Sequence, residues 1–101
     1  MIIPNKIKIG AHEYQVIRDD DGADEDARFG HCMPRRLRIY VDPRVPQSQQ
    51  EETLIHEVLH AVCDQVRAFS KQETGRDEEE RVVQSLGHGI YQFLKDNDLL
   101  K

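Results

Sequence analysis

The sequence has no long apolar run, and none approaches the ~18 residues that a membrane-spanning helix requires. Its N-terminal stretch, MIIPNKIKIG, lacks the long apolar segment and the small-residue cleavage site of a signal peptide. An excess of basic residues is also missing: the formal net charge is −5, which argues against a general nucleic-acid binder held by phosphate contacts. We therefore expect a cytoplasmic protein with neither a membrane nor a nucleic acid as its partner.

Cysteine is scarce as well. The chain has two, Cys32 and Cys63, and without a secretory signal we expect both to remain reduced thiols. With 101 residues, of which 38% are hydrophobic, the chain lies near the lower end of the size at which one core becomes stable. It leaves little room for a second domain, so we expect a single domain over residues 1–101.

The first half of the chain carries strand patterns. Residues 6–18, KIKIGAHEYQVIR, hold two short alternating runs around Gly10 and predict a β-hairpin. The acidic stretch DDDGADEDARFG, residues 19–30, is rich in turn residues and does not reproduce the ligand positions of an EF-hand, so it is predicted to be an exposed loop. MPRRLRIYVDP predicts a third strand near a sheet edge, because apolar Leu37, Ile39 and Val41 alternate with Arg36, Arg38 and Tyr40.

The second half has a helical pattern. The first helix is predicted to open at PQSQQEE, with Ser48 as a candidate cap, and to run to about Phe69. After a polar link over residues 70–77, Asp77 is a candidate cap for a second helix that runs to about Asp96. Spacings of three and four predict the buried faces: Leu54, Ile55, Val58, Leu59, Val62, Val66 and Phe69, then Val82, Val83, Leu86, Ile90, Phe93 and Leu94. Strands followed by helices predict an α+β fold, a small antiparallel sheet of about three strands packed on two helices.

The stretch TLIHEVLHAVCD, residues 53–64, places two histidines four residues apart inside the first helix. At 3.6 residues per turn, His56 and His60 project from one side, about 40° apart, so both imidazoles can reach one zinc ion. Glu57 is turned by about 100° from His56, where it can hold a water molecule as a general base rather than join the pair. The motif can arise by chance, but its place in a periodic helix, off the apolar stripe, favours a Zn²⁺ site.

Two histidines leave such a site one protein ligand short, because catalytic zinc commonly has three. Cys63 follows on nearly the same helical face, but three ligands from consecutive turns of one helix would splay, so we interpret it as a half-buried thiol. The opening turn of the second helix offers better geometry, and both Glu79 and Glu80 could reach the ion. Gly87 would let the two helices approach closely. The full set of candidates is Glu78, Glu79, Glu80, His31, Cys32, Cys63 and His88, of which His88 is expected to be exposed to solvent.

The pattern HEVLH followed by E-x-x-V-x-x-L-G, from Glu80 to Gly87, resembles the small gluzincin-like metallopeptidases of phages and mobile elements. These are related to the ImmA/IrrE group, whose second helix carries E-x-x-A-x-x-F-A. The stretches FGHCMPRRLRIYVDP and GIYQFLKDN also look like the phage-type members, so the likeness covers nearly the whole chain. It implies a minimal zincin-like fold, a bacterial host cytoplasm and Glu80 as the third ligand. Val83 and Gln84 depart from the pattern, which bears on how the site is tuned.

The resulting hypothesis is a zinc-dependent metallopeptidase that hydrolyses a protein or peptide with metal-activated water and Glu57 as general base. An extended substrate could pair with the strand at residues 37–41, flanked by Arg36, Arg38 and Tyr40. Tyr91 is a candidate oxyanion donor, with a packing role as the alternative.

Two other classes of function remain open. One is a catalytically silent, zinc-stabilised binding module, and the other is an adaptor without metal. About a hundred residues leave little material for specificity pockets, which favours a recruited partner or an oligomer that completes the cleft.

Overall fold

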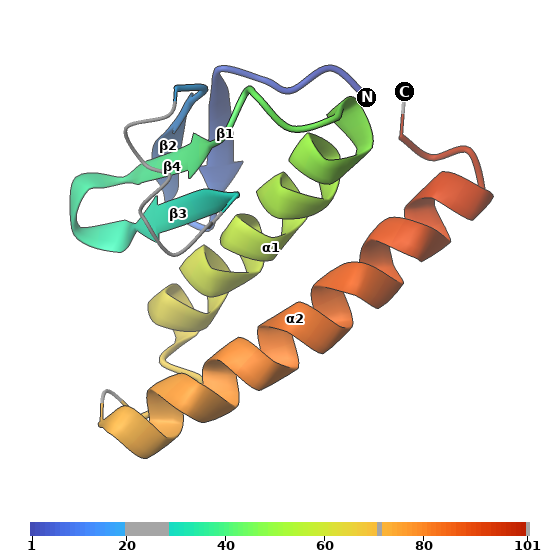
Figure 1. The fold of residues 1–101 in the computed structure, drawn as a ribbon. Helices are drawn as coiled ribbons and strands as arrows, with labels where there is room; N and C mark the ends of the chain where they lie inside the picture. Colours follow the sequence, from blue (N-terminus) through green and yellow to red (C-terminus); the bar gives the residue numbers. More distant parts are fainter. Residues whose placement is uncertain (20–28, 71, 101) are drawn as a thin grey trace.

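The computed structural model describes residues 1–19, 29–70 and 72–100, and it confirms an α+β fold (Figure 1). The elements follow in the order β1 (Lys6–Ile9), β2 (His12–Ile17), β3 (Gly30–Met33), the 3-10 turn η2 (Pro34–Arg36), β4 (Arg38–Val41), α1 (Gln47–Val66) and α2 (Glu73–Asp96). The exposed loop predicted for the acidic stretch lies largely at residues 20–28, outside the described residues. Among the described helices none is long and apolar enough to cross a membrane.

The sheet has four strands in the order β1-β2-β4-β3. The predicted hairpin is confirmed: β1 pairs antiparallel with β2, and Gly10, with φ +61°, opens the turn between them. The prediction of about three strands, all antiparallel, was wrong on two counts. The short strand β3 pairs with β4, and β4 runs parallel to β2. β3 has only four residues and begins with glycine, so its alternation is too short to predict a strand. The parallel direction of β4 depends on the chain crossing over between the strands, which local patterns do not encode.

β4 lies inside the sheet, between β2 and β3, so the prediction of an edge strand here was also wrong. The strand begins at Arg38 rather than at Leu37, which ends η2 in a left-handed conformation with φ 54°. From there the predicted alternation holds, since Ile39 and Val41 are fully buried. The edge strand next to α1 is β3 instead.

α1 is the central element, with the sheet on one side and α2 on the other (Figure 1). The core forms between the sheet and α1, and its buried members are Ile3, Ile9, Tyr14, Val16, Ile39, Val41, Leu54 and Ala61. α1 begins at Gln47, so Ser48 lies inside the first turn and no side chain caps the helix. α2 begins at Glu73, four residues before the predicted cap at Asp77, because polar residues can extend a helix that needs no buried face there.

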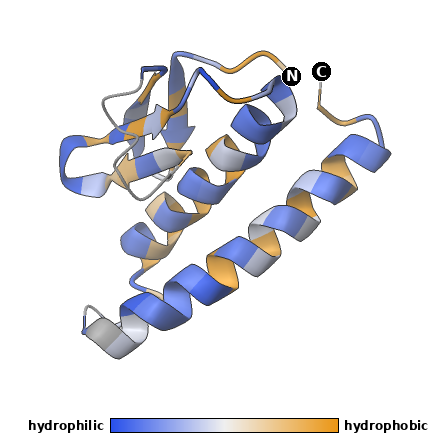
Figure 2. Ribbon diagram, viewed as in Figure 1, coloured by the Kyte–Doolittle hydropathy of each residue, from blue (hydrophilic) through white to orange (hydrophobic). Residues whose placement is uncertain are grey.

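Both predicted apolar faces are only partly buried, although apolar positions recur along α2 after its polar opening turns (Figure 2). α2 has one neighbouring helix, against which it buries Val83 and Tyr91 together with Gly87. The predicted core residues that are exposed instead are Val62, Val66, Leu86, Ile90 and Phe93. α2 packs on one side only and therefore buries about one residue per turn, whereas Val62 and Val66 lie on a side of α1 that neither the sheet nor α2 covers. Periodicity alone does not reveal either limit.

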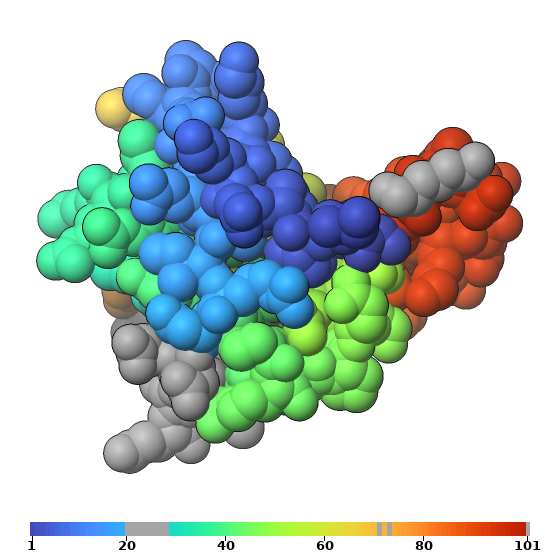
Figure 3. Space-filling model, turned by 90° about the horizontal axis from the view of Figure 1, so that it is seen from above, coloured from blue at the N-terminus to red at the C-terminus, as the bar shows by residue number. Residues whose placement is uncertain are grey.

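A buried carboxylate ties α1 to α2 and to the N-terminal residues, which reach toward the end of α2 in Figure 3. Glu51 is 5% exposed and accepts hydrogen bonds from the Tyr91 hydroxyl at 2.8 Å and from the Met1 amine at 3.2 Å. Burial by itself would raise the pKa of Glu51, but these donors, with Gln47, hold it below its ordinary value. Tyr91 therefore stabilises the fold at this position.

Replacing Tyr91 by Phe is expected to lower the free energy of unfolding by about 1.5–3 kcal/mol, the usual worth of a hydrogen bond to a charged group. The pKa of Glu51 is lower in the folded protein than its ordinary value of 4.5, which applies to the unfolded chain. The difference in the free energy of unfolding between the two proteins should therefore be complete above pH 4.5 and should shrink as the pH falls through the pKa of the folded state. Urea unfolding at several pH values measures it. Tyr40→Phe is the matched control, and equal stability of Tyr91→Phe and wild type would contradict the role.

Candidate metal centre

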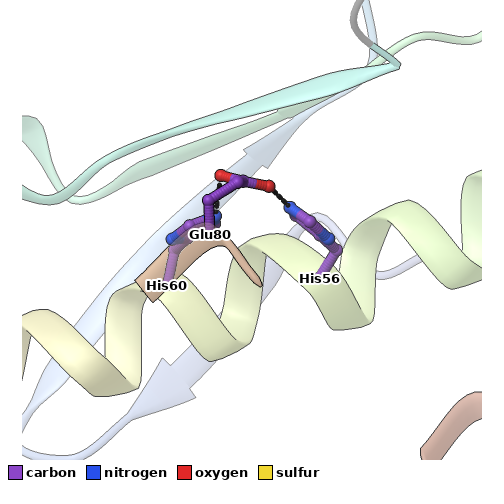
Figure 4. Close-up of side chains that lie close together, drawn as sticks. All are labelled: His56, His60 and Glu80. Atoms are coloured by element: carbon purple, nitrogen blue, oxygen red, sulfur yellow. Dashed lines mark ion pairs between the residues drawn. The ribbon is translucent and has the colours of Figure 1, made fainter. Parts of the chain in front are cut away.

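His56, His60 and Glu80 lie together, two from the middle of α1 and one from α2 (Figure 4). The two carboxylate oxygens of Glu80 lie 3.0 Å from His56 Nε2 and 3.0 Å from His60 Nε2. One ligand atom from each of the three residues lies within 4.8 Å of the others. The side chains meet because α2 runs antiparallel to α1, which brings its second turn beside the two histidines.

The spacing of these atoms suits a metal ion. A tetrahedral ion with ligands at about 2.0–2.2 Å holds its ligand atoms about 3.4 Å apart, which lies between the two 3.0 Å contacts and the 4.8 Å within which all three ligand atoms lie. The Glu80 side chain is 54% exposed and therefore has room to adjust its position. Two imidazole nitrogens and one carboxylate form a donor set that zinc commonly uses. These residues could hold a metal ion.

Glu79, the other candidate ligand, contacts the opposite side of the His60 ring. Its Oε2 lies 2.6 Å from His60 Nδ1, and the side chain is 25% exposed. A hydrogen bond from Nδ1 to this carboxylate selects the tautomer whose Nε2 lone pair points into the cluster. The packing of α2 therefore separates the two adjacent glutamates: Glu80 joins the cluster, and Glu79 orients one of the histidines.

Burial controls the protonation of the groups around the cluster. It lowers the pKa of His56 despite the opposing charge of Glu80, and the neighbouring His60 lowers it further, so His56 stays neutral at pH 7. Burial also raises the pKa of Cys32 to about 12, with help from the charges of Glu57, Asp64 and Glu79. Cys32 and Cys63 are both free, and Cys63 lies outside the cluster.

Glu57 faces β3 rather than the histidine cluster, as its 100° offset in the helix requires. It is 7% exposed and lines the same cavity as the three candidate ligands. Gly30 packs closely against α1 and β4 beside Glu57. A Cβ on Gly30 would lie 2.5 Å from Thr53 Cγ2 and 2.6 Å from the Tyr40 carbonyl oxygen. Sequence reasoning missed Gly30, although an isolated glycine beside a strand pattern is a known signal of close backbone approach.

The cavity is a trough of about 1360 Å³. α1 forms its floor, β3 and η2 form one wall, and α2 forms the other. Gly87 faces α1 at His56 and Leu59, and a Cβ there would lie 3.7 Å from His56 Cα, an ordinary contact distance. The two helices therefore meet at Gly87, but a methyl group would also fit between them.

Several residues that the sequence suggested for the site lie elsewhere. Arg38 and Tyr40 alternate with buried Ile39 and Val41, so they occupy the sheet face away from α1 and do not line the trough. Tyr91 is also outside it, with its hydroxyl bonded to Glu51. His88 is exposed, as predicted, and its Nδ1 lies 2.9 Å from Glu52 Oε1 at the rim. These placements have two causes: successive residues of β4 alternate between the two faces of the sheet, and Tyr91 lies about three turns beyond Glu80 along α2.

A comparison with protein-family models agrees with this geometry. The model of the IrrE N-terminal-like domain, peptidase M78, matches residues 11–93. This range contains His56, Glu57, His60, Glu79 and Glu80. Neither the curated proteins nor the solved structures contain a match to the chain. Since the matched range covers well over half of the sequence, the chain belongs to the peptidase M78 family of IrrE N-terminal-like domains.

Proposed function

We propose that this protein is a zinc-dependent metallopeptidase. The observation that carries the proposal is the cluster of His56, His60 and Glu80 in the same trough as the buried carboxylate of Glu57. Membership of a peptidase family supports the same reading. Zinc is proposed over harder metals because two of the three donor atoms are imidazole nitrogens.

Each residue has a separate task in this proposal. A bound zinc ion would polarise the scissile carbonyl and make water acidic enough to attack near neutral pH. Glu57 accepts the proton of the attacking water and later delivers it to the leaving amine. Glu79 holds the His60 ring in its working orientation through Nδ1. The half-buried position of the histidines limits the access of bulk water to the cluster.

The substrate is proposed to be an extended peptide that lies beside β3. This strand, not β4, is the sheet edge at the trough, and an edge strand has free backbone groups to which a peptide can add as a further strand. His31 and Met33 line the trough at this edge.

Cleavage that depends on zinc tests the proposal. Purified protein is loaded with zinc or stripped with a chelator, incubated with a complex peptide mixture, and the new termini are identified by mass spectrometry. We expect cleavage in the loaded sample, none in the stripped sample, and recovery when zinc is restored. Stoichiometric zinc binding without any cleavage would favour the silent binding module instead.

A further inference from the structure

The trough has two chemically different ends. Along its floor the lining residues run from Gln49 to Asp64, and α2 runs the other way, since Glu52 meets His88 while His60 meets Glu79. β3 runs in the direction of α1. Gly30 at the start of β3 lies against Thr53, whereas the charge of Asp64, further along α1, contributes to the raised pKa of Cys32. All three elements therefore define the same two ends of the trough. One end lies beside the part of α1 that precedes the histidine cluster, and the other beside the part that follows it.

The end that follows the cluster carries three exposed arginines from two walls of the trough. Arg35 and Arg36 belong to η2, and Arg76 belongs to the first turn of α2. Figure 1 shows the β3–β4 connection and the start of α2 at the same end of α1. Within the described part of the chain, no hydrogen bond or ion pair joins these guanidinium groups to another side chain. The opposite end instead has Phe29 and the Glu52–His88 pair.

Three exposed arginines at one end of the trough form a local positive patch in a chain whose net charge is −5. Asp64 also lies at this end, but it has interactions of its own. Guanidinium groups bind carboxylates through paired hydrogen bonds, a geometry that the ammonium group of lysine does not offer. The arginine end is therefore suited to an acidic side chain.

We propose that Arg35, Arg36 and Arg76 form a subsite for an aspartate or glutamate of the substrate. This inference rests on the proposed function and names its substrate class, extended peptides with an acidic residue at a fixed place. From Glu80 to Arg76 the helix advances about 6 Å at 1.5 Å per residue. An extended chain covers that length in about two residues. The acidic residue of the substrate is therefore expected about two residues from the cleaved bond, on the side of that bond that faces the arginines.

The test compares cleavage sites in a peptide library at low and high salt. The wild type should prefer Asp or Glu over Asn or Gln at one position near the cut, by about 1.5- to 5-fold for each arginine engaged. Raising the salt should weaken the preference, because the contacts are exposed. The triple variant Arg35→Gln, Arg36→Gln, Arg76→Gln should lose it, so that Asp and Asn peptides are cut at equal rates. Arg38→Gln, on the far face of the sheet, is the matched control and should keep it.

Two outcomes separate this inference from the proposed function. Cleavage without an acidic preference, or a preference that survives in the triple variant, overturns the subsite and leaves the peptidase intact. If no peptide is cut, fluorescence anisotropy with labelled decapeptides that differ only by Asp or Asn decides the matter. Tighter binding of the Asp peptide by the wild type alone then supports the arginine subsite, and equal binding by both proteins overturns it.

Discussion

Replacing Glu57 by Gln is expected to reduce peptide cleavage by about 10²- to 10⁴-fold, the range that a positioned general base contributes. The amide has nearly the same shape as the carboxylate but cannot accept the proton of the attacking water. Glu57 lies outside the cluster of His56, His60 and Glu80, so zinc content should stay near that of the wild type. Turnover on a cleaved library peptide and zinc analysis of the same preparation measure both effects.

A matched substitution in the same trough serves as the control. Glu52→Gln changes a carboxylate on the same helix that pairs with His88 at the rim, and it should leave turnover close to that of the wild type. Loss of zinc in Glu57→Gln would make Glu57 a ligand rather than a base. Full activity in this variant would remove Glu57 from the reaction altogether.

The three consecutive glutamates of α2 are expected to differ sharply in their effect on zinc affinity. Glu80→Gln removes one of the three proposed ligands and should produce the largest loss. Glu79→Gln removes the partner of His60 Nδ1, and such changes typically weaken metal binding by about 10- to 100-fold. Glu78 is exposed and does not line the trough, so Glu78→Gln should bind zinc like the wild type. Competition with a chromophoric chelator gives the three affinities.

The same series predicts a difference in thermal stability. A ligand that binds only the folded state at a thousand times its dissociation constant stabilises it by about 4.1 kcal/mol. Adding zinc should therefore raise the melting temperature of the wild type and of Glu78→Gln, raise that of Glu79→Gln less, and leave Glu80→Gln unchanged. A larger loss in Glu79→Gln than in Glu80→Gln would mean that the two glutamates exchange roles when the ion binds.

The parts of the site that arise within one helix were predictable. His56, Glu57 and His60 lie within five residues of α1, and their relative directions follow from 3.6 residues per turn. The hairpin of β1 and β2 was predictable for the same reason, since alternating residues on both sides of Gly10 specify it locally. The family resemblance extended this reading to Glu80 on another helix, which geometry within α1 could not reach.

Tertiary structure decided the rest. The choice between Glu79 and Glu80 at the cluster depends on how α2 is rotated against α1. Contacts of the buried residues Val83, Gly87 and Tyr91 hold this rotation. Arg38 and Tyr40 lie on the face of the sheet away from the site, because the residues of β4 that alternate with them are buried toward α1. Arg35 and Arg36 instead line the trough from η2.

Sequence alone indicated the residues for the proposed chemistry, two imidazoles and a nearby carboxylate, and it also indicated the α+β fold class. Both follow from the spacing of residues along short segments. Only the tertiary structure decided which strand forms the edge, which glutamate faces the imidazoles and where Arg35, Arg36 and Arg76 lie. The physical reason is that periodicity reports which side of a segment is apolar, while the order of strands and the packing of helices depend on contacts between residues far apart in the chain.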